Sequence, residues 1–162
     1  MTGKVFIPPN AIGSTPGKLI FLAGPIQHED DWQTDAIDYI RSIDKDVHIA
    51  SPKRADHGDF DEQVDWETTH LRRAGENGVV LFWLAKEVKH DCSRVFAKTT
   101  RLELFEWKMM HTFKGAQLVV GIENGFTGAR YIKRRFSQDC PDVPICSNLE
   151  KTCKKAIELC QK

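Results

Sequence analysis

The sequence lacks the features that mark several common classes of protein. Lys plus Arg and Asp plus Glu each number 23 in 162 residues, so the formal net charge is zero and nothing favours nucleic acid as a partner. No apolar run approaches the roughly 20 residues that cross a bilayer. The N-terminal stretch is too short and too interrupted by Pro for a signal peptide. We therefore expect a cytoplasmic protein with no membrane partner.

Paired cysteines and phosphate-binding signatures are also missing. An odd number of cysteines in an intracellular chain argues against a disulfide framework, and no CxxC pair indicates a metal site. We expect buried hydrophobic cysteines, with a metal site as the weaker alternative. Neither GxGxxG nor a Walker motif occurs, so a dinucleotide cofactor and ATP-type phosphoryl transfer lack support. The five cysteines are Cys92, Cys140, Cys146, Cys153 and Cys160.

The chain does contain an alternation of apolar strands and amphipathic helices. This alternation predicts an α/β fold with a mostly parallel sheet of about five strands. We expect one domain over residues 18–162, behind an extended leader of residues 1–17 that is rich in Pro and Gly. Strands are predicted at 18–24, 46–52, 78–85, 116–122 and 142–146, and helices at 30–43, 61–74, 99–114, 128–136 and 147–160.

Ligands bind at the carboxyl ends of the strands in such a sheet, so the loops 24–31, 51–60, 85–98 and 123–128 are candidate site segments. In the first of these loops, Gly24-Pro25 allows a ligand to approach the backbone, although a plain turn is the alternative.

The predicted helix 61–74 carries an acid on its apolar stripe. Glu67 lies on the same helix face as Val64 and Leu71. A carboxylate on an apolar face is costly to bury unless another group binds it. His70 is its neighbour on the helix surface. The alternatives are a partly exposed Glu67 and a hydrogen-bonded, structural His70.

The stretch "TTRLELFEWKMM" (99–110) has two interpretations. Thr100 and Glu103 fit a capping box, in which Glu103 returns to the Thr100 backbone N–H. The same carboxylate in the first helical turn also suits a nucleophile, because the helix dipole favours its charge and apolar neighbours remove its solvent. Spacing alone does not decide between them.

Three motifs in order resemble the nucleoside 2-deoxyribosyltransferase superfamily, and most closely its deoxyribosyltransferase-like branch. They are "KLIFLAGPI", "VDWETTHLRRAGENGVVLFWL" and "TRLELFEW", and the similarity covers about residues 18–122. The resemblance implies a flavodoxin-like three-layer fold with helices on both faces of the sheet. It also implies a homodimer or larger homo-oligomer in which a neighbouring subunit helps to complete each site.

The resemblance assigns roles to individual residues. Glu103 aligns with the family's nucleophile, and His70 falls where the family has an Asp that handles the base or its proton. Glu67, one turn away, is the alternative for that role. Substrate contacts are expected at Phe21, Gly24, Pro25, Gln27 and Asp65.

The chain departs from the family pattern at several positions. The family's Glu-Leu-Gly is Glu-Leu-Phe here, with Phe105 in place of Gly, and its first-strand Tyr is Phe21. Ala97 stands at a commonly polar position. No phosphate-binding Ser and Arg cluster follows Gly24, so Lys53 and Arg54 are alternative phosphate ligands, or merely solvated loop charges.

These residues favour a nucleoside 2′-deoxyribosyltransferase that exchanges nucleobases through a covalent deoxyribosyl-Glu103 intermediate, as a retaining glycosidase does. The expected partners are a nucleoside or nucleotide and a free base, with no metal or organic cofactor. The alternatives are an N-glycosidase acting on deoxynucleosides or their 5′-monophosphates, and a non-catalytic nucleotide-binding module. A purely structural protein would show no deep pocket beside Glu103 and Glu67.

Overall fold

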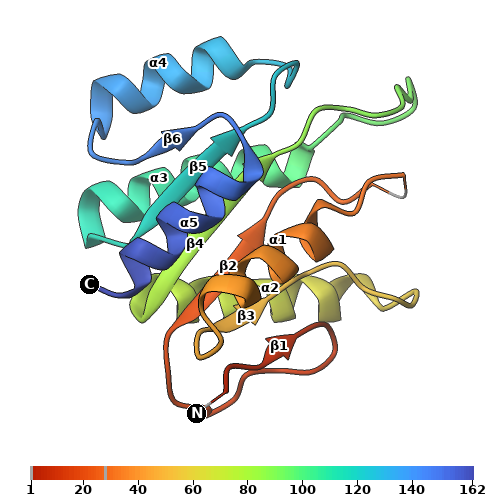
Figure 1. The fold of residues 1–162 in the computed structure, drawn as a ribbon. Coiled ribbons are helices and arrows are strands. Elements are labelled where there is room, and N and C mark those ends of the chain that lie inside the picture. Colours follow the sequence, from red (N-terminus) through yellow and green to blue (C-terminus); the bar gives the residue numbers. More distant parts are fainter. Residues whose placement is uncertain (1, 28) are drawn as a thin grey trace.

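The computed structural model describes residues 2–27 and 29–162. The described residues form one sheet of six strands, all parallel, in the order β1-β3-β2-β4-β5-β6. The carboxyl ends of the strands and the loops that follow them lie on one side of the molecule (Figure 1). The strands are β1 (Val5–Phe6), β2 (Leu19–Ala23), β3 (His48–Ala50), β4 (Gly78–Leu84), β5 (Leu118–Ile122) and β6 (Ile145–Cys146).

The strand order reverses between β2 and β4, the two central strands. From β2 the chain moves outward to β3, and it then returns to β4 on the other side of β2. Without the edge strand β1, this is the flavodoxin order, and its switch point is where ligands bind in open parallel sheets. The switch point therefore lies between the loops that follow β2 and β4.

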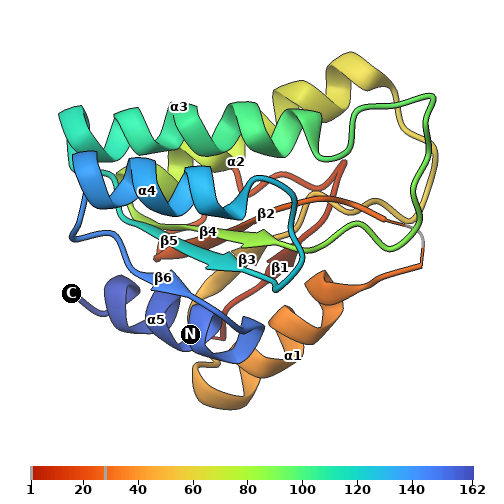
Figure 2. The same cartoon turned by 90° about the horizontal axis from the view of Figure 1, so that it is seen from above.

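Helices cover both faces of the sheet, as Figure 2 shows with the sheet seen between them. One face carries α1 (Trp32–Ile43) and α5 (Leu149–Cys160), and the other carries α2 (Phe60–Glu76), α3 (Lys98–Lys114) and α4 (Ala129–Asp139). The three layers confirm the predicted fold class. No helix in the described part of the chain is both long and apolar enough to cross a membrane.

The N-terminal segment contributes a strand that the sequence pattern did not predict. Val5–Phe6 pairs with β3 in parallel and extends the sheet to six strands. Two residues are too few to show the period of a strand in the sequence. The position of β1 in the sheet depends instead on backbone hydrogen bonds, such as the one that the Ile49 N–H donates to the Lys4 carbonyl at 2.9 Å. The extended leader is thus partly built into the sheet.

Helices α2 and α3 are in contact through a large side chain that packs against a glycine. A Cβ on Gly75 of α2 would lie 2.3 Å from the indole of Trp107 in α3, so only glycine leaves room for this contact. Trp107 is buried, and it lies one turn after Glu103 on α3. Gly75 lies two turns after Glu67 on α2. This contact therefore joins the two helices that carry the candidate acids.

Candidate active site

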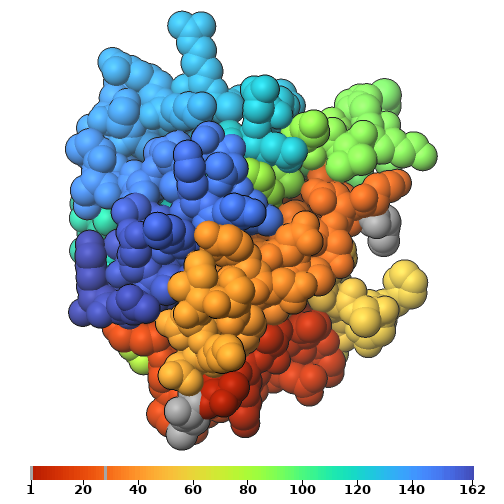
Figure 3. Space-filling view, viewed as in Figure 1, coloured from red at the N-terminus to blue at the C-terminus, as the bar shows by residue number. Residues whose placement is uncertain are grey.

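A pocket of about 370 Å³ opens at the switch point of the sheet. The loops around 51–59 and 86–97, which lie beside it, project from the same side of the molecule (Figure 3). A pocket in this place is not what the purely structural alternative predicts. Its lining comes from β2 and its loop (Phe21, Ala23, Gly24, Pro25, Ile26), from Pro52 and α2 (Phe60, Gln63, Val64, Glu67), and from the loop before α3 and that helix (Arg94, Val95, Phe96, Ala97, Lys98, Thr99, Thr100, Glu103).

The β2 end of the pocket is held by two tryptophans. A Cβ on Gly24 would lie 2.3 Å from the backbone oxygen of Trp83 and 2.6 Å from the ring of Trp32. The Trp32 indole N–H donates to the Pro25 carbonyl at 2.9 Å. Gly24 and Pro25 line the pocket as expected, and glycine is required there by close packing behind the loop.

Glu103 projects from the first turns of α3 into this pocket and is half-buried. Burial, together with the negative charges of Glu67 and Glu106, raises the pKa of Glu103 to about 8. The structure brings Glu103 and Glu67 into the same pocket from two helices. It thus joins two of the three residues that were expected to carry the chemistry.

Glu67 is half-buried and held by one neighbour on its own helix. The Gln63 side-chain N–H donates to Oε1 of Glu67 at 2.5 Å. Burial raises the pKa of the Glu67 carboxyl, while the Gln63 hydrogen bond acts in the opposite direction. With both pKa values raised, this pair of carboxyls retains a proton at a higher pH than two solvated glutamates would.

His70, the third expected residue, does not line the pocket, which favours the alternative of a structural histidine. Its side chain is fully buried, and its Nε2 accepts from the Ile12 N–H at 3.0 Å. Its Nδ1 lies 2.7 Å from the Trp66 carbonyl, and the ring stacks on the Trp66 indole. Burial lowers the pKa of His70, so it is a neutral, hydrogen-bonded core histidine.

Gln27 and Asp65, which were also expected to contact substrate, do not line the pocket either. Gln27 is buried and binds the loop after β4: its side-chain amide donates to the Lys86 carbonyl, and its Oε1 accepts from the Val88 N–H at 2.9 Å. Asp65 is exposed on the outer side of α2.

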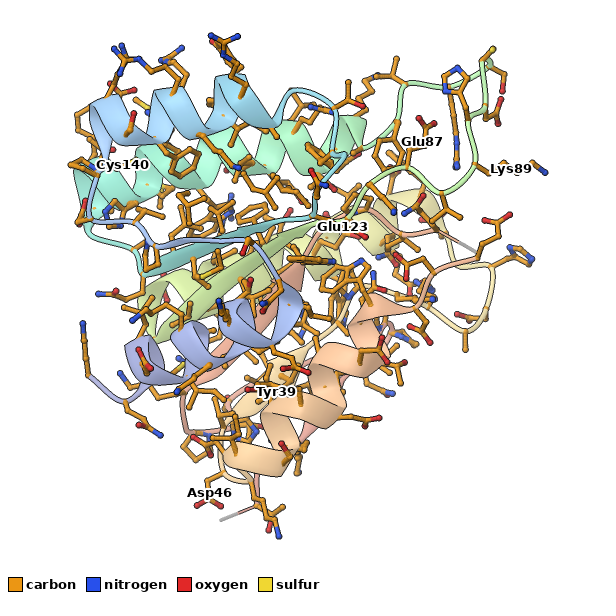
Figure 4. The ribbon with its side chains drawn as sticks, turned by 45° about the horizontal axis from the view of Figure 1, so that its top comes forward. Tyr39, Asp46, Glu87, Lys89, Glu123 and Cys140 are labelled. Atoms are coloured by element: carbon orange, nitrogen blue, oxygen red, sulfur yellow. The ribbon has the colours of Figure 1, made fainter. Side chains whose placement is uncertain are left out.

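The loop after β4 is also attached to the loop after β5. Glu123 accepts from the Lys86 backbone N–H at 2.8 Å, and Figure 4 shows Glu123 near the sheet with Glu87 and Lys89 farther out along the neighbouring loop. Near the other end of that loop, Phe96 packs against Phe126 with ring centroids 6.1 Å apart. These contacts hold both ends of the segment that forms one pocket wall.

The start of α3 differs from the predicted capping box. The helix begins at Lys98 after Ala97, whose φ of 54° is left-handed, and no side chain caps it. Thr100 is inside the helix and only 5% exposed; within the described residues, neither its hydroxyl nor its backbone N–H has a hydrogen-bond partner. Glu103 is therefore free of the capping role, and the first residues of α3, which line the pocket, have no side-chain cap on their N–H groups.

A second hollow of about 360 Å³ adjoins the pocket and shares Glu67 and Gln63 with it. Arg54 lines this hollow, but its guanidinium is already paired with Asp56 and Glu62, each at 3.0 Å. Lys53 binds Asp31 at 3.1 Å and does not line the pocket. The alternative of Lys53 and Arg54 as phosphate ligands is therefore not supported. Arg94 and Lys98 are instead the basic residues of the pocket.

No group of three His, Cys, Asp or Glu side chains in residues 2–27 and 29–162 has the arrangement of a metal site. Three of the cysteines (Cys140, Cys153 and Cys160) are buried, while Cys92 is exposed and Cys146 is half-buried. Burial raises the pKa of the Cys153 and Cys160 thiols to about 12, so they are unreactive core residues.

Several pocket residues were not predicted from the sequence. The loop 85–98 was recognised as a candidate segment, but Arg94 and Lys98 within it carry no motif. Gln63 had a usable signal, since it precedes Glu67 by four residues and so shares its helix face. Phe60 is 78% exposed, and no periodic pattern marks its place at the pocket mouth.

The comparison with protein families agrees with this geometry. The family described as nucleoside 2-deoxyribosyltransferase like matches residues 17–126, well over half of the chain. No curated protein matches the chain. The matched range runs from β2 through β5 and holds Phe21, Gly24, Glu67 and Glu103, together with the other residues that line the pocket. This chain therefore belongs to the nucleoside 2-deoxyribosyltransferase-like family.

Proposed function

We propose that the protein is a nucleoside 2′-deoxyribosyltransferase that exchanges nucleobases on 2′-deoxyribose. The observation that carries the proposal is the pair of carboxyl groups, Glu103 and Glu67, in one pocket at the switch point. Because the pKa of Glu103 is about 8 and that of Glu67 is also raised, the pair retains one proton near neutral pH, which rests mainly on Glu103 in the free protein. The reactive form that we propose is the one in which this shared proton lies on Glu67 and Glu103 is ionised. Cleavage with retention needs one carboxylate and one carboxylic acid.

In the proposed mechanism, ionised Glu103 attacks C1′ of the deoxyribose as the bond from C1′ to the base nitrogen breaks. Glu67, in its protonated form, gives its proton to the departing base. A second base then attacks C1′ from the face that the first base left, the bond to Glu103 breaks, and the second base returns a proton to Glu67. The two displacements give net retention. Water in place of the second base would give hydrolysis.

The two adjoining hollows support an orientation for the substrate. We place the sugar above Glu103 in the first hollow and the base in the second, because Glu67 lies at their boundary and must reach the base nitrogen. Phe60 lines both hollows and offers an aromatic face to a planar base.

The start of α3 favours a second candidate, cleavage or transfer on 5′-monophosphates. Uncapped backbone N–H groups, the unpartnered Thr100 hydroxyl, and the basic side chains Arg94 and Lys98 all border the pocket. A helix N-terminus with nearby cations suits a phosphate.

Incubation with a deoxynucleoside and a different free base, followed by chromatography, tests the proposal. We expect a new deoxynucleoside in the presence of the second base. Free base and deoxyribose alone would indicate hydrolysis. No turnover of purine or pyrimidine donors, with or without a 5′-phosphate, would contradict both candidates. Glu103→Gln is the control, and we expect it to abolish turnover.

A further inference from the structure

One residue of the pocket, Gln63, uses both of its amide N–H groups and its amide oxygen in hydrogen bonds beside the proposed acid, Glu67. Its two amide N–H groups meet the Pro52 carbonyl at 3.0 Å and Oε1 of Glu67 at 2.5 Å. Its oxygen accepts from Nη1 of Arg54 at 3.4 Å. Arg54 can only donate and the Pro52 carbonyl can only accept, so the amide has one possible orientation. The NH₂ group therefore faces Glu67.

Arg54 is itself held firmly. Its side chain is only 10% exposed and binds Asp56 and Glu62. The guanidinium lies over Gly58, where a Cβ would come within 1.9 Å of its central carbon. The chain of contacts from Arg54 through Gln63 to Glu67 thus starts from a fixed cation and ends on a carboxyl group that lines both hollows.

The series of hydrogen bonds from Arg54 through Gln63 distinguishes the two carboxyl oxygens of Glu67. Oε1 accepts the Gln63 N–H, so it has no place for a proton of its own along that bond. A carbonyl oxygen accepts a hydrogen bond better than the hydroxyl oxygen of a neutral acid does, so this bond favours Oε1 as the carbonyl oxygen and Oε2 as the oxygen that carries the proton. We propose that Gln63 is a positioning residue that fixes the proton of Glu67 on Oε2, for delivery to the departing base. This inference rests on the proposed function, and it assigns Gln63 no contact with the reacting atoms.

The surroundings of Glu67 allow this effect to be isolated. Glu103 of α3 shares the pocket, Arg94 and Lys98 border it, and Arg54 acts through Gln63. Replacing Gln63 by Leu removes the hydrogen bond that Oε1 of Glu67 accepts, while all four of these charged side chains remain present. The exposed Gln138 on α4, whose side chain has no hydrogen-bond partner in the described part of the chain, gives a matched control, Gln138→Leu.

The experiment has two readouts. We expect Gln63→Leu to lower kcat by about tenfold or more with KM changed less than threefold, because the acid is misplaced while substrate contacts persist. We also expect carbon NMR of labelled glutamates to show a higher pKa for Glu67 in this variant, since a hydrogen bond to the ionised form is lost. Gln138→Leu should change neither.

A second variant keeps the test valid if Gln63→Leu unfolds. The Gln63→Glu side chain can donate to Glu67 only while protonated, so we expect its kcat to recover partly as the pH falls. An unchanged kcat and an unchanged Glu67 titration in Gln63→Leu would overturn the inference, as would a Gln63→Glu profile identical to wild type. Failure of the wild type to turn over nucleosides would instead contradict the proposed function, and the NMR titration would still decide the role of Gln63.

Discussion

Trp107 of α3 occupies the space that a side chain on Gly75 of α2 would need, with its ring 2.3 Å from the position of a Cβ there. Glu67 and Glu103 lie on these same two helices, toward the pocket. The site therefore depends on a close helix contact some two turns away from the proposed chemistry on α2.

Substituting Gly75 by Ala should push the two helices apart. We expect the free energy of unfolding to fall by about 1–2 kcal/mol despite the better helix propensity of Ala, because the buried indole must move. Activity should fall further than stability alone explains. Chemical denaturation and base-exchange rates measure the two effects. Arg72→Ala, an exposed change on the same helix, is the control, and an equal effect of both substitutions would refute the prediction.

The raised pKa of Glu103 predicts a pH-dependent cost in stability. The pKa is about 8 in the folded protein against 4.5 for the model value, so the folded state binds more protons between these limits. Stability therefore falls as the pH rises from about 4.5 to 8. Glu103→Gln removes this cost. We expect it to stabilise the protein by about 2 kcal/mol at pH 8, after allowance for partial solvent exposure, and by little at pH 4.5.

Thermal unfolding at several pH values checks this prediction. Glu76→Gln, an exposed carboxylate at the end of α2, serves as the matched control and should show no such trend. A stabilisation by Glu103→Gln that is the same at pH 4.5 and pH 8 would mean that the carboxyl of Glu103 is not the titrating group.

The basic side chains at the start of α3 predict a preference among substrates. If a 5′-phosphate binds there, Lys98→Ala should raise KM for a 5′-monophosphate by about three- to tenfold, as for loss of one charged contact, and leave KM for the unphosphorylated nucleoside unchanged. Steady-state kinetics on both substrates makes the comparison. Lys133→Ala on the exposed face of α4 is the control. An equal change for both substrates would argue against a phosphate subsite.

An exposed apolar stripe on α3 fits the expected homo-oligomer. Leu102, Met109 and Phe113 are spaced by seven and four residues, and they are 66%, 47% and 73% exposed. We expect this stripe to pack against a second copy. Phe113→Lys should then shift the mass in light scattering from a multiple of the chain mass to 18.5 kDa. A monomeric wild type, or an unchanged oligomer in the variant, would contradict this expectation.

The sequence was sufficient for the layers of the fold, and it singled out two carboxyl groups, Glu103 and Glu67, that line the same pocket. The strand pattern predicted the parallel sheet because strands such as β4 are apolar throughout, and the resemblance selected Glu103 as the proposed nucleophile. The sequence left His70 open between a catalytic and a structural role, because the partner that favours the structural one, the Ile12 N–H, lies 58 residues away. The sequence did not show the contacts of Gln27 either, since its partners Lys86 and Val88 lie about 60 residues on. In both cases, long-range contacts decide whether a polar side chain serves the fold or the pocket.

The central claim is that Glu103 forms a covalent bond to the sugar. A 2′-deoxy-2′-fluoroarabinosyl nucleoside slows the second displacement and should leave its sugar on the enzyme. Mass spectrometry of the intact protein should then show the added fluorosugar, and a digest should locate it on the peptide that contains Glu103. Glu103→Gln should stay unmodified. A wild-type protein that turns over deoxynucleosides yet carries the label on another residue, or on none, would contradict the account.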